Sequence, residues 1–132
     1  MVKISKQVDY GIQFLMRLAL DTKSTISLRE FSIEHNISFL FMQKIVKKLR
    51  EAKLVESYRG ASGGYMLSRN PETLSLIEIM ESIEGPYMIS ECTNKGIVCV
   101  KISTCTAKKP LHGIQTQITS YLQQTTLKSL LQ

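Results

Sequence analysis

SLREFSIEHNISFLFMQKIVKKLREAKLVESYRGASGGYMLSR, residues 27–69, carries the pattern from which the fold of this chain follows. Ser27 stands three residues before Glu30, and this S-x-x-E spacing predicts a capping box in which each side chain bonds the other residue's free backbone N–H. A short helix ending near His35 is expected after it. The side chains that this helix can contribute to a core are Leu28, Phe31 and Ile33.

A second helix is predicted over residues 39–52, because apolar residues recur there at helical spacing after Ser38, a predicted N-cap. Its remaining surface is polar and basic, which is typical of the second helix of a helix-turn-helix. Glutamine can pair with adenine in the major groove, and lysine can reach guanine or phosphate. The residues predicted to contact DNA here are Ser38, Gln43, Lys44, Lys47 and Lys48. The alternative is a solvated basic face without a ligand.

Two strand-like runs, residues 54–59 and 65–69, enclose a glycine-rich turn and predict a β-hairpin, which after a helix-turn-helix is a wing. Arg59 stands beside this turn, where a guanidinium can enter a narrow minor groove. Gly60 and Gly63 allow the backbone to approach phosphate closely. The alternative for Arg59 is an ordinary surface arginine near a turn.

Helical patterns flank this segment. We expect a long, well-buried helix over residues 5–21 with Val8, Leu15 and Leu20 on its apolar face, a capped helix over 75–83, and a helix from Pro110 to about residue 124. The predicted fold class is mainly α with a small β-hairpin. Its parts are a winged helix-turn-helix domain (1–84), a cysteine loop (85–107) and a long C-terminal dimerisation helix with a last turn (108–132). The narrow apolar stripe of that helix can also pack against its own domain.

The net charge of +6 is unevenly placed along the 132 residues. Residues 1–69 hold 12 Lys/Arg and 6 Asp/Glu, a difference of +6, whereas residues 70–132 hold 5 of each. A basic half joined to a neutral half indicates a nucleic-acid-binding module with a sensor or dimerisation module, although lysines that merely keep the protein soluble are the alternative. No apolar run approaches the roughly 18 residues of a membrane span. We therefore expect a cytoplasmic protein without a membrane partner.

Three cysteines, Cys92, Cys99 and Cys105, form the pattern C-x6-C-x5-C and are the only cysteines of the chain. Clustered thiols in a reducing compartment indicate metal ligands or redox sensors, and three thiolates can hold an iron–sulfur cluster that usually takes four. Structural zinc is an alternative, although the tight C-x2–4-C pair of zinc loops is absent. Reactive or free thiols are another alternative. His112 and Asp9 are candidate fourth ligands, and both have ordinary helical roles as alternatives. No phosphate-loop or H-E-x-x-H motif is present, so an enzyme is not expected.

Five features together resemble the family of winged-helix transcription regulators that includes IscR and NsrR. They are residues 4–10 (ISKQVDY), 49–55 (LREAKLV), 59–65 (RGASGGY), the three cysteines and residues 126–130 (TLKSL). The resemblance runs over nearly the whole length. It implies a homodimeric repressor on a palindromic double-stranded DNA operator, with the second helix of the helix-turn-helix in the major groove, Arg59 of the wing in the minor groove, and the helix from Pro110 crossing between subunits.

The resemblance also implies that an iron–sulfur cluster on the three cysteines, preferably 4Fe–4S and otherwise 2Fe–2S, controls DNA affinity in response to nitric oxide, iron or oxygen, in that order of preference. Lys108 stands where IscR has a ligating histidine, and Gln43 stands where IscR has a glutamate that tunes operator choice. Asp9 matches the NsrR pattern, in which an aspartate of the partner subunit completes the cluster, so Asp9 ranks above His112.

Three rival functions remain open from the sequence. The first is a cluster-free repressor of the same fold that responds to thiol chemistry or to a small molecule. The second is a redox or electron-transfer protein that does not bind DNA. The third is an interaction module stabilised by zinc.

Overall fold

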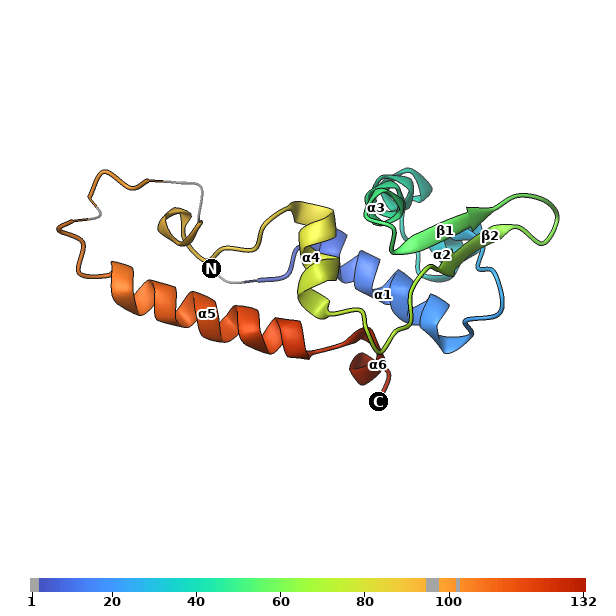
Figure 1. Cartoon of the computed structure of the whole chain (residues 1–132). Helices are drawn as coiled ribbons and strands as arrows, with labels where there is room; N and C mark the ends of the chain where they lie inside the picture. The colour runs from blue at the N-terminus through green and yellow to red at the C-terminus, as the bar shows by residue number, and fades with distance from the viewer. Residues whose placement is uncertain (1–2, 95–97, 102) are drawn as a thin grey trace.

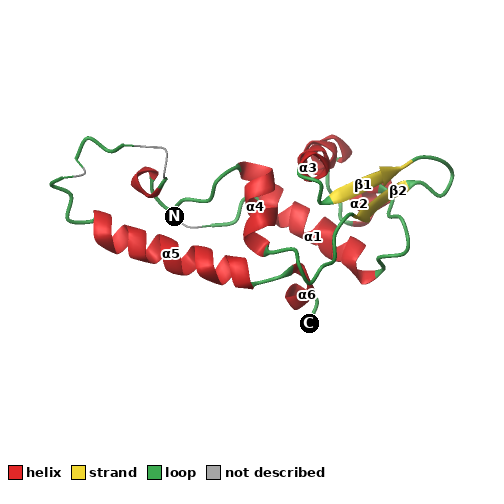
Figure 2. Ribbon diagram, in the orientation of Figure 1, coloured by secondary structure: helices red, strands yellow, loops and turns green. Residues whose placement is uncertain are grey.

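The computed structural model describes residues 3–94, 98–101 and 103–132; residues 95–97 and 102 of the predicted cysteine loop lie outside the described residues. Figure 1 and Figure 2 show a mainly helical chain with one small hairpin, as predicted. The elements in chain order are α1 (Lys6–Leu20), α2 (Leu28–Glu34), α3 (Phe39–Glu51), β1 (Val55–Tyr58), β2 (Gly64–Leu67), α4 (Leu76–Glu84), the 3-10 turn η1 (Glu91–Thr93), α5 (Lys108–Gln124) and α6 (Leu127–Leu130).

The core is built around α1, which packs against α3, α4, α6 and β2. Its buried apolar side chains are Val8, Phe14, Leu15 and Leu18. Gly11 is also buried, and a Cβ added there would lie 2.5 Å from Ile83 Cδ1 and 3.4 Å from Ile45 Cγ2. The missing side chain therefore lets α4 and α3 approach α1 closely.

In α1 and α2, two predicted core positions are wrong, and one buried aromatic side chain was missed. Ile33 is 74% exposed, because it lies two residues after buried Phe31 and so on the opposite side of the short helix α2. Leu20 is 69% exposed at the last residue of α1. Phe14, absent from the predicted apolar face, is fully buried and packs edge-on against Phe31 and Tyr65.

Serine residues cap the first four helices, and the caps at Ser27, Ser38 and Ser75 were predicted from the sequence, whereas the Ser5 cap of α1 was not. Ser38 Oγ accepts a hydrogen bond from Phe41 N–H at 3.4 Å. The box at Ser75 and Glu78 is reciprocal. At Ser27 only half of the predicted box forms, since Ser27 Oγ accepts from Glu30 N–H and no described hydrogen bond returns from the Glu30 side chain.

The hairpin pairs β1 and β2 in antiparallel register, with Val55 opposite Leu67 and Tyr58 opposite Gly64. Two 2.9 Å backbone hydrogen bonds between Ile26 and Tyr65 attach this hairpin to the chain before α2. Gly64 adopts a positive φ of 151°, and a Cβ there would lie 2.6 Å from the Ile26 carbonyl oxygen. The hairpin can dock in this way because residue 64 is a glycine.

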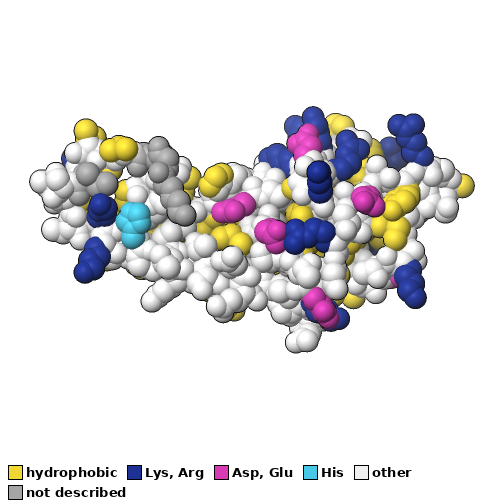
Figure 3. Space-filling model, viewed as in Figure 1, with side chains coloured by type: hydrophobic (Ala, Val, Ile, Leu, Met, Phe, Trp, Pro, Cys, Tyr) yellow, Lys and Arg dark blue, Asp and Glu magenta, His cyan; other side chains and the backbone are white. Residues whose placement is uncertain are grey.

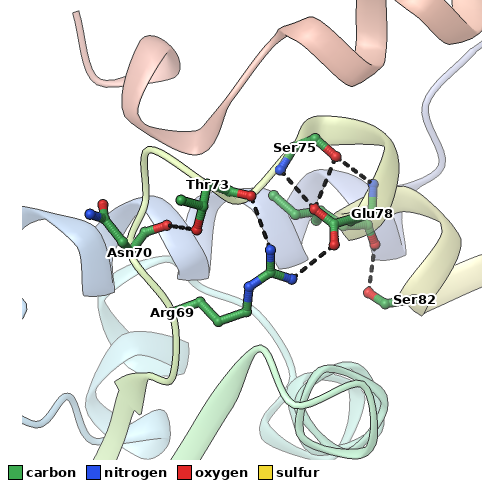
Figure 4. A network of polar contacts seen from close by, with 7 residues as sticks. Arg69, Asn70, Thr73, Ser75, Glu78 and Ser82 are labelled. Carbon is green, nitrogen blue, oxygen red and sulfur yellow. Dashed lines mark hydrogen bonds and ion pairs between the residues drawn. The ribbon is translucent and has the colours of Figure 1, made fainter.

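An ion pair joins the end of the hairpin to α4 (Figure 4). Arg69 donates to Glu78 Oε1 at 2.8 Å and to the Thr73 carbonyl oxygen at 3.0 Å. Glu78 Oε2 accepts from the backbone N–H and the hydroxyl of Ser75. The Arg69 guanidinium, followed by the Ser75 hydrogen bonds, holds the pKa of the Glu78 carboxyl below its usual range.

Helix α5 extends away from the body formed by α1 to α4, and the segment before it folds back beside it (Figure 1). None of its residues is buried. The chain then returns to the body, where Leu127 of α6 is fully buried and its N–H donates to the Leu74 carbonyl oxygen at 2.8 Å. In the part of the chain that the structure describes, no helix is long and apolar enough to cross a membrane.

Replacing Gly64 by alanine is expected to lower the free energy of unfolding by about 1–3 kcal/mol, because the new Cβ meets the Ile26 carbonyl at a positive φ. Gly113→Ala is the matched control. Its Cβ would have no atom within 4 Å, and removing a glycine from α5 should raise stability by about 0.5–1 kcal/mol. Urea unfolding measures both changes, and a Gly64→Ala protein as stable as the parent would contradict the close docking of Gly64 on Ile26.

Acidification should weaken the tie between Arg69 and Glu78. The unfolded carboxyl has the higher pKa and binds the proton more readily, so the stability from this pair is present at neutral pH and is lost as pH falls through the lowered pKa of the folded state. Both side chains are more than a third exposed, so salt should reduce the effect. We expect the unfolding midpoint of Glu78→Gln to fall less steeply than that of the parent as the pH is lowered. Glu51→Gln controls for the loss of one carboxylate.

Candidate nucleic-acid interface and cysteine segment

The exposed face of α3 carries three of the predicted DNA-reading side chains. Gln43, Lys44 and Lys47 are exposed, while Met42, Ile45, Val46 and Leu49 turn inward. Figure 3 shows Lys and Arg side chains gathered over α3 and the neighbouring hairpin. Packing of the apolar face against the core thus leaves a polar and basic face open to a large anionic ligand.

Lys48, the fifth predicted contact, has protein partners instead of an open ammonium group. Its Nζ donates to Gln7 Oε1 at 3.2 Å and to the Ile83 carbonyl oxygen at 2.9 Å. These bonds link α3 to α1 and α4. The sequence gives no reason to treat Lys48 differently from Lys47. Only the tertiary structure shows that Lys48 has protein partners and that Lys47 is exposed.

The start of α3 has a basic neighbour that the sequence reasoning missed. Arg29 of α2 stacks over the Phe39 ring, with its guanidinium carbon 4.3 Å from the ring centroid. This contact places a positive charge over Phe39, the first residue of α3. The only signal in the sequence was a basic residue facing solvent in the first helix of the motif.

The turn of the wing holds Arg59 in solvent. Arg59, Gly60, Ala61 and Ser62 are all exposed, and Arg59 has no ion-pair partner among the described residues. Gly60 has a φ of 111°, and a Cβ on Gly63 would lie 2.5 Å from the Tyr58 carbonyl oxygen. Both glycines are therefore needed by the turn itself, and their contact with DNA stays a prediction.

The three cysteines are free thiols in the segment before α5. Cys92 in η1 is half-buried with its sulfur 3.4 Å from Ser90 Oγ, Cys99 is half-buried, and Cys105 is exposed. Among the described residues, no three His, Cys, Asp or Glu side chains come together as a metal site. Two lysines and no carboxylate lie between the first and third cysteines. That chemistry suits thiolate ligands of a negatively charged iron centre, although the single chain does not assemble them.

Neither candidate for the fourth ligand completes such a group. Asp9 is exposed in the first turn of α1, where its Oδ1 accepts from Gln13 Nε2 at 3.0 Å. His112 is exposed on α5. Their roles as ligands remain predictions.

Gln115 of α5 holds the cysteine segment in place, and sequence reasoning did not single it out. Its Oε1 accepts from Ile89 N–H at 2.8 Å, and its Nε2 donates to the Tyr87 carbonyl oxygen at 3.0 Å. Its Oε1 also lies 3.2 Å from the hydroxyl of buried Thr93, the residue after Cys92. The carboxamide therefore joins the segment around Cys92 to the long helix.

Comparison with known proteins agrees with this architecture. A model of the Rrf2 family, described as iron-dependent transcriptional regulators, matches residues 4–132. The regulator NsrR of Halalkalibacterium halodurans is 29% identical, with 98% of this chain and 90% of the relative covered. IscR of Cereibacter sphaeroides is 32% identical, with 98% and 87% covered.

A solved structure gives the same fold. CymR, the global cysteine regulator of B. subtilis, superposes with a TM-score of 0.83 at 32% identity, covering 99% of this chain and 97% of the other. The predicted winged helix-turn-helix with a long C-terminal helix is thereby confirmed. From the family match over residues 4–132 and the shared fold, the chain belongs to the Rrf2 family of DNA-binding transcriptional regulators and is not an enzyme.

Proposed function

We propose that this chain is a repressor whose affinity for a palindromic double-stranded operator is controlled by an iron–sulfur cluster bound to Cys92, Cys99 and Cys105. One observation carries the proposal. In a family described as iron-dependent, the segment from Cys92 to Cys105 holds all three cysteines and no carboxylate, and Gln115 of the long helix bonds Thr93, the residue after Cys92. A regulator of this kind acts in the cytoplasm, where the operator is. Family membership overturns the electron-transfer protein that does not bind DNA.

A homodimer is supported by apolar side chains that α5 leaves exposed. Leu111, Ile118 and Leu122 are half-buried and share one helix face with Gln115, which bonds the preceding segment. Ile114 and Tyr121, seven residues apart on a second face, are 46% and 70% exposed. A second copy can cover this exposed pair, and the resulting two-fold symmetry matches a palindromic operator.

In the proposed complex, α3 enters the major groove and the wing lies over the minor groove. Gln43, Lys44 and Lys47 face the base edges and phosphates, and Arg59 reads the width of the minor groove. Lys48 contributes less than the sequence suggests, because its ammonium group already bonds Gln7 and Ile83.

The three cysteines would supply three thiolate ligands, and Asp9 of a partner subunit ranks above His112 as the fourth. A bound cluster, 4Fe–4S or 2Fe–2S, would supply iron that nitric oxide or oxygen can attack and that iron scarcity removes. A carboxylate is a hard ligand on a soft, sulfur-rich cluster, so Asp9 would leave one iron exchangeable. Gln115 would carry a rearrangement of the Cys92 segment to α5, and a coupling of about 1–3 kcal/mol between cluster and operator suffices for regulation.

A second candidate is a repressor that responds through its thiols without a cluster. The single chain does not gather its cysteines into a metal site among the described residues, and its fold is similar to that of a global cysteine regulator. Iron and sulfide analysis of anaerobically purified protein separates the two candidates, and zinc in the same analysis would indicate the zinc-stabilised alternative.

Replacing Arg59 by alanine should weaken operator binding by about 1–3 kcal/mol, because a wing guanidinium would leave the minor groove. Fluorescence anisotropy at fixed salt, on a duplex that the protein selects from a random pool, measures the loss. Lys128→Ala is the control, since Lys128 is exposed on α6, away from α3 and the wing. Equal operator affinities for the parent and Arg59→Ala would show that the wing arginine is not part of the interface.

Replacing Cys92, Cys99 and Cys105 together by alanine should abolish iron and sulfide uptake in anaerobic reconstitution and make operator affinity independent of iron. Ser103→Ala, in the same segment, should behave like the parent. Asp9→Ala and His112→Ala separate the fourth ligands, and we expect Asp9→Ala to shorten the lifetime of bound iron. Unchanged reconstitution in the triple variant would disprove the cluster assignment. If the iron-free parent protein loses its affinity for the operator when its thiols are oxidised, the second candidate is established.

A further inference from the structure

The first turn of α3 differs from the first turns of the other helices in the DNA-binding domain. A serine caps each of α1, α2, α3 and α4 by accepting a backbone N–H. The helices α1, α2 and α4 then place an acid in the first turn, namely Asp9, Glu30 and Glu78. An acid there is favoured by the helix dipole, yet α3 has none and begins with the apolar residues 39–41. Such an end suits a ligand that brings its own negative charge.

Leu40 is the exposed member of these three apolar residues. Phe39 lies under the Arg29 guanidinium, and Phe41 packs edge-on against Tyr10 with ring centroids 5.9 Å apart. Leu40 is 70% exposed. Among the residues that the structure describes, Leu40 has no core contact that would explain an apolar side chain at this position.

Leu40 also shares the open face of α3 with the polar residues proposed to contact DNA. Leu40, Gln43, Lys44 and Lys47 are spaced at i, i+3, i+4 and i+7, and all four are exposed. This spacing places them in one stripe along the helix. Leu40 is at the N-terminal end of the stripe, which is the end that contacts base edges when a helix of this kind lies in the major groove.

The chemistry of the major groove identifies the base. Adenine, guanine and cytosine present hydrogen-bonding groups there, and thymine alone adds a C5-methyl group. An isobutyl side chain cannot satisfy donors or acceptors and would desolvate them at a cost. Against a methyl group it buries apolar surface on both partners.

We propose that Leu40 is a specificity-determining residue that selects thymine in each operator half-site through van der Waals contact with the thymine methyl group. The inference rests on the proposed placement of α3 in the major groove. It deepens that proposal by naming one base and the atom that is read.

Deoxyuridine lacks only this methyl group, so it tests the contact directly. A duplex is first selected from a random pool by the full-length parent protein, in whichever of the reconstituted or iron-free forms binds more tightly. Each thymine of that duplex is then replaced singly by deoxyuridine, and affinities are measured at fixed salt. We expect one thymine in each half-site whose replacement weakens parent binding about fourfold, the effect of one buried methyl group.

The variant Leu40→Ala should lose this sensitivity and bind the thymine and deoxyuridine duplexes within twofold of each other. Ile33→Ala removes a similarly exposed apolar side chain from α2 and should keep the parent's sensitivity. Thermal unfolding should show both variants as folded as the parent, because neither side chain is buried.

Three results would overturn the inference: a selected half-site without a preferred thymine, no deoxyuridine effect on the parent, or the same effect on Leu40→Ala. Each leaves the DNA-binding function standing. Failure of the pool to enrich any sequence would instead refute the proposed operator recognition, and with it the contact.

Discussion

The close packing of α1 against α3 and α4 is the constraint on which the rest of the structure depends. Gly11 has no side chain, so Ile83 of α4 and Ile45 of α3 can approach the α1 backbone. Once the apolar face of α3 is buried in this way, only one face remains open, and it carries Gln43 and Lys44. Core packing therefore decides which α3 side chains stay exposed, and it gives Lys48 hydrogen-bond partners in α1 and α4.

The wing depends on a second, weaker set of contacts. Two strands alone are marginally stable in water, and this pair is held by the backbone bonds between Ile26 and Tyr65 and by the Arg69–Glu78 tie to α4. These contacts set the direction in which Arg59 leaves the body. The position of the wing relative to α3 is thus a property of the assembled domain.

Helix α5 presents two faces. One is used within the chain, where Gln115 holds the segment around Cys92, and the other leaves Ile114 and Tyr121 exposed. In the proposed function, a change in the cysteine segment acts on the element that holds the two subunits together.

Local patterns by themselves determined the helix-turn-helix, the hairpin, the serine caps and the chemical character of the cysteine segment, because each depends on residues only a few positions apart. Tertiary structure decided what distant segments bring together. Lys48 bonds residues 41 and 35 positions away, and Gln115 bonds backbone groups 26 and 28 positions away. Ile33 is exposed because the core approaches α2 from one side only. No periodicity encodes such pairings, since they arise only when the buried faces have packed.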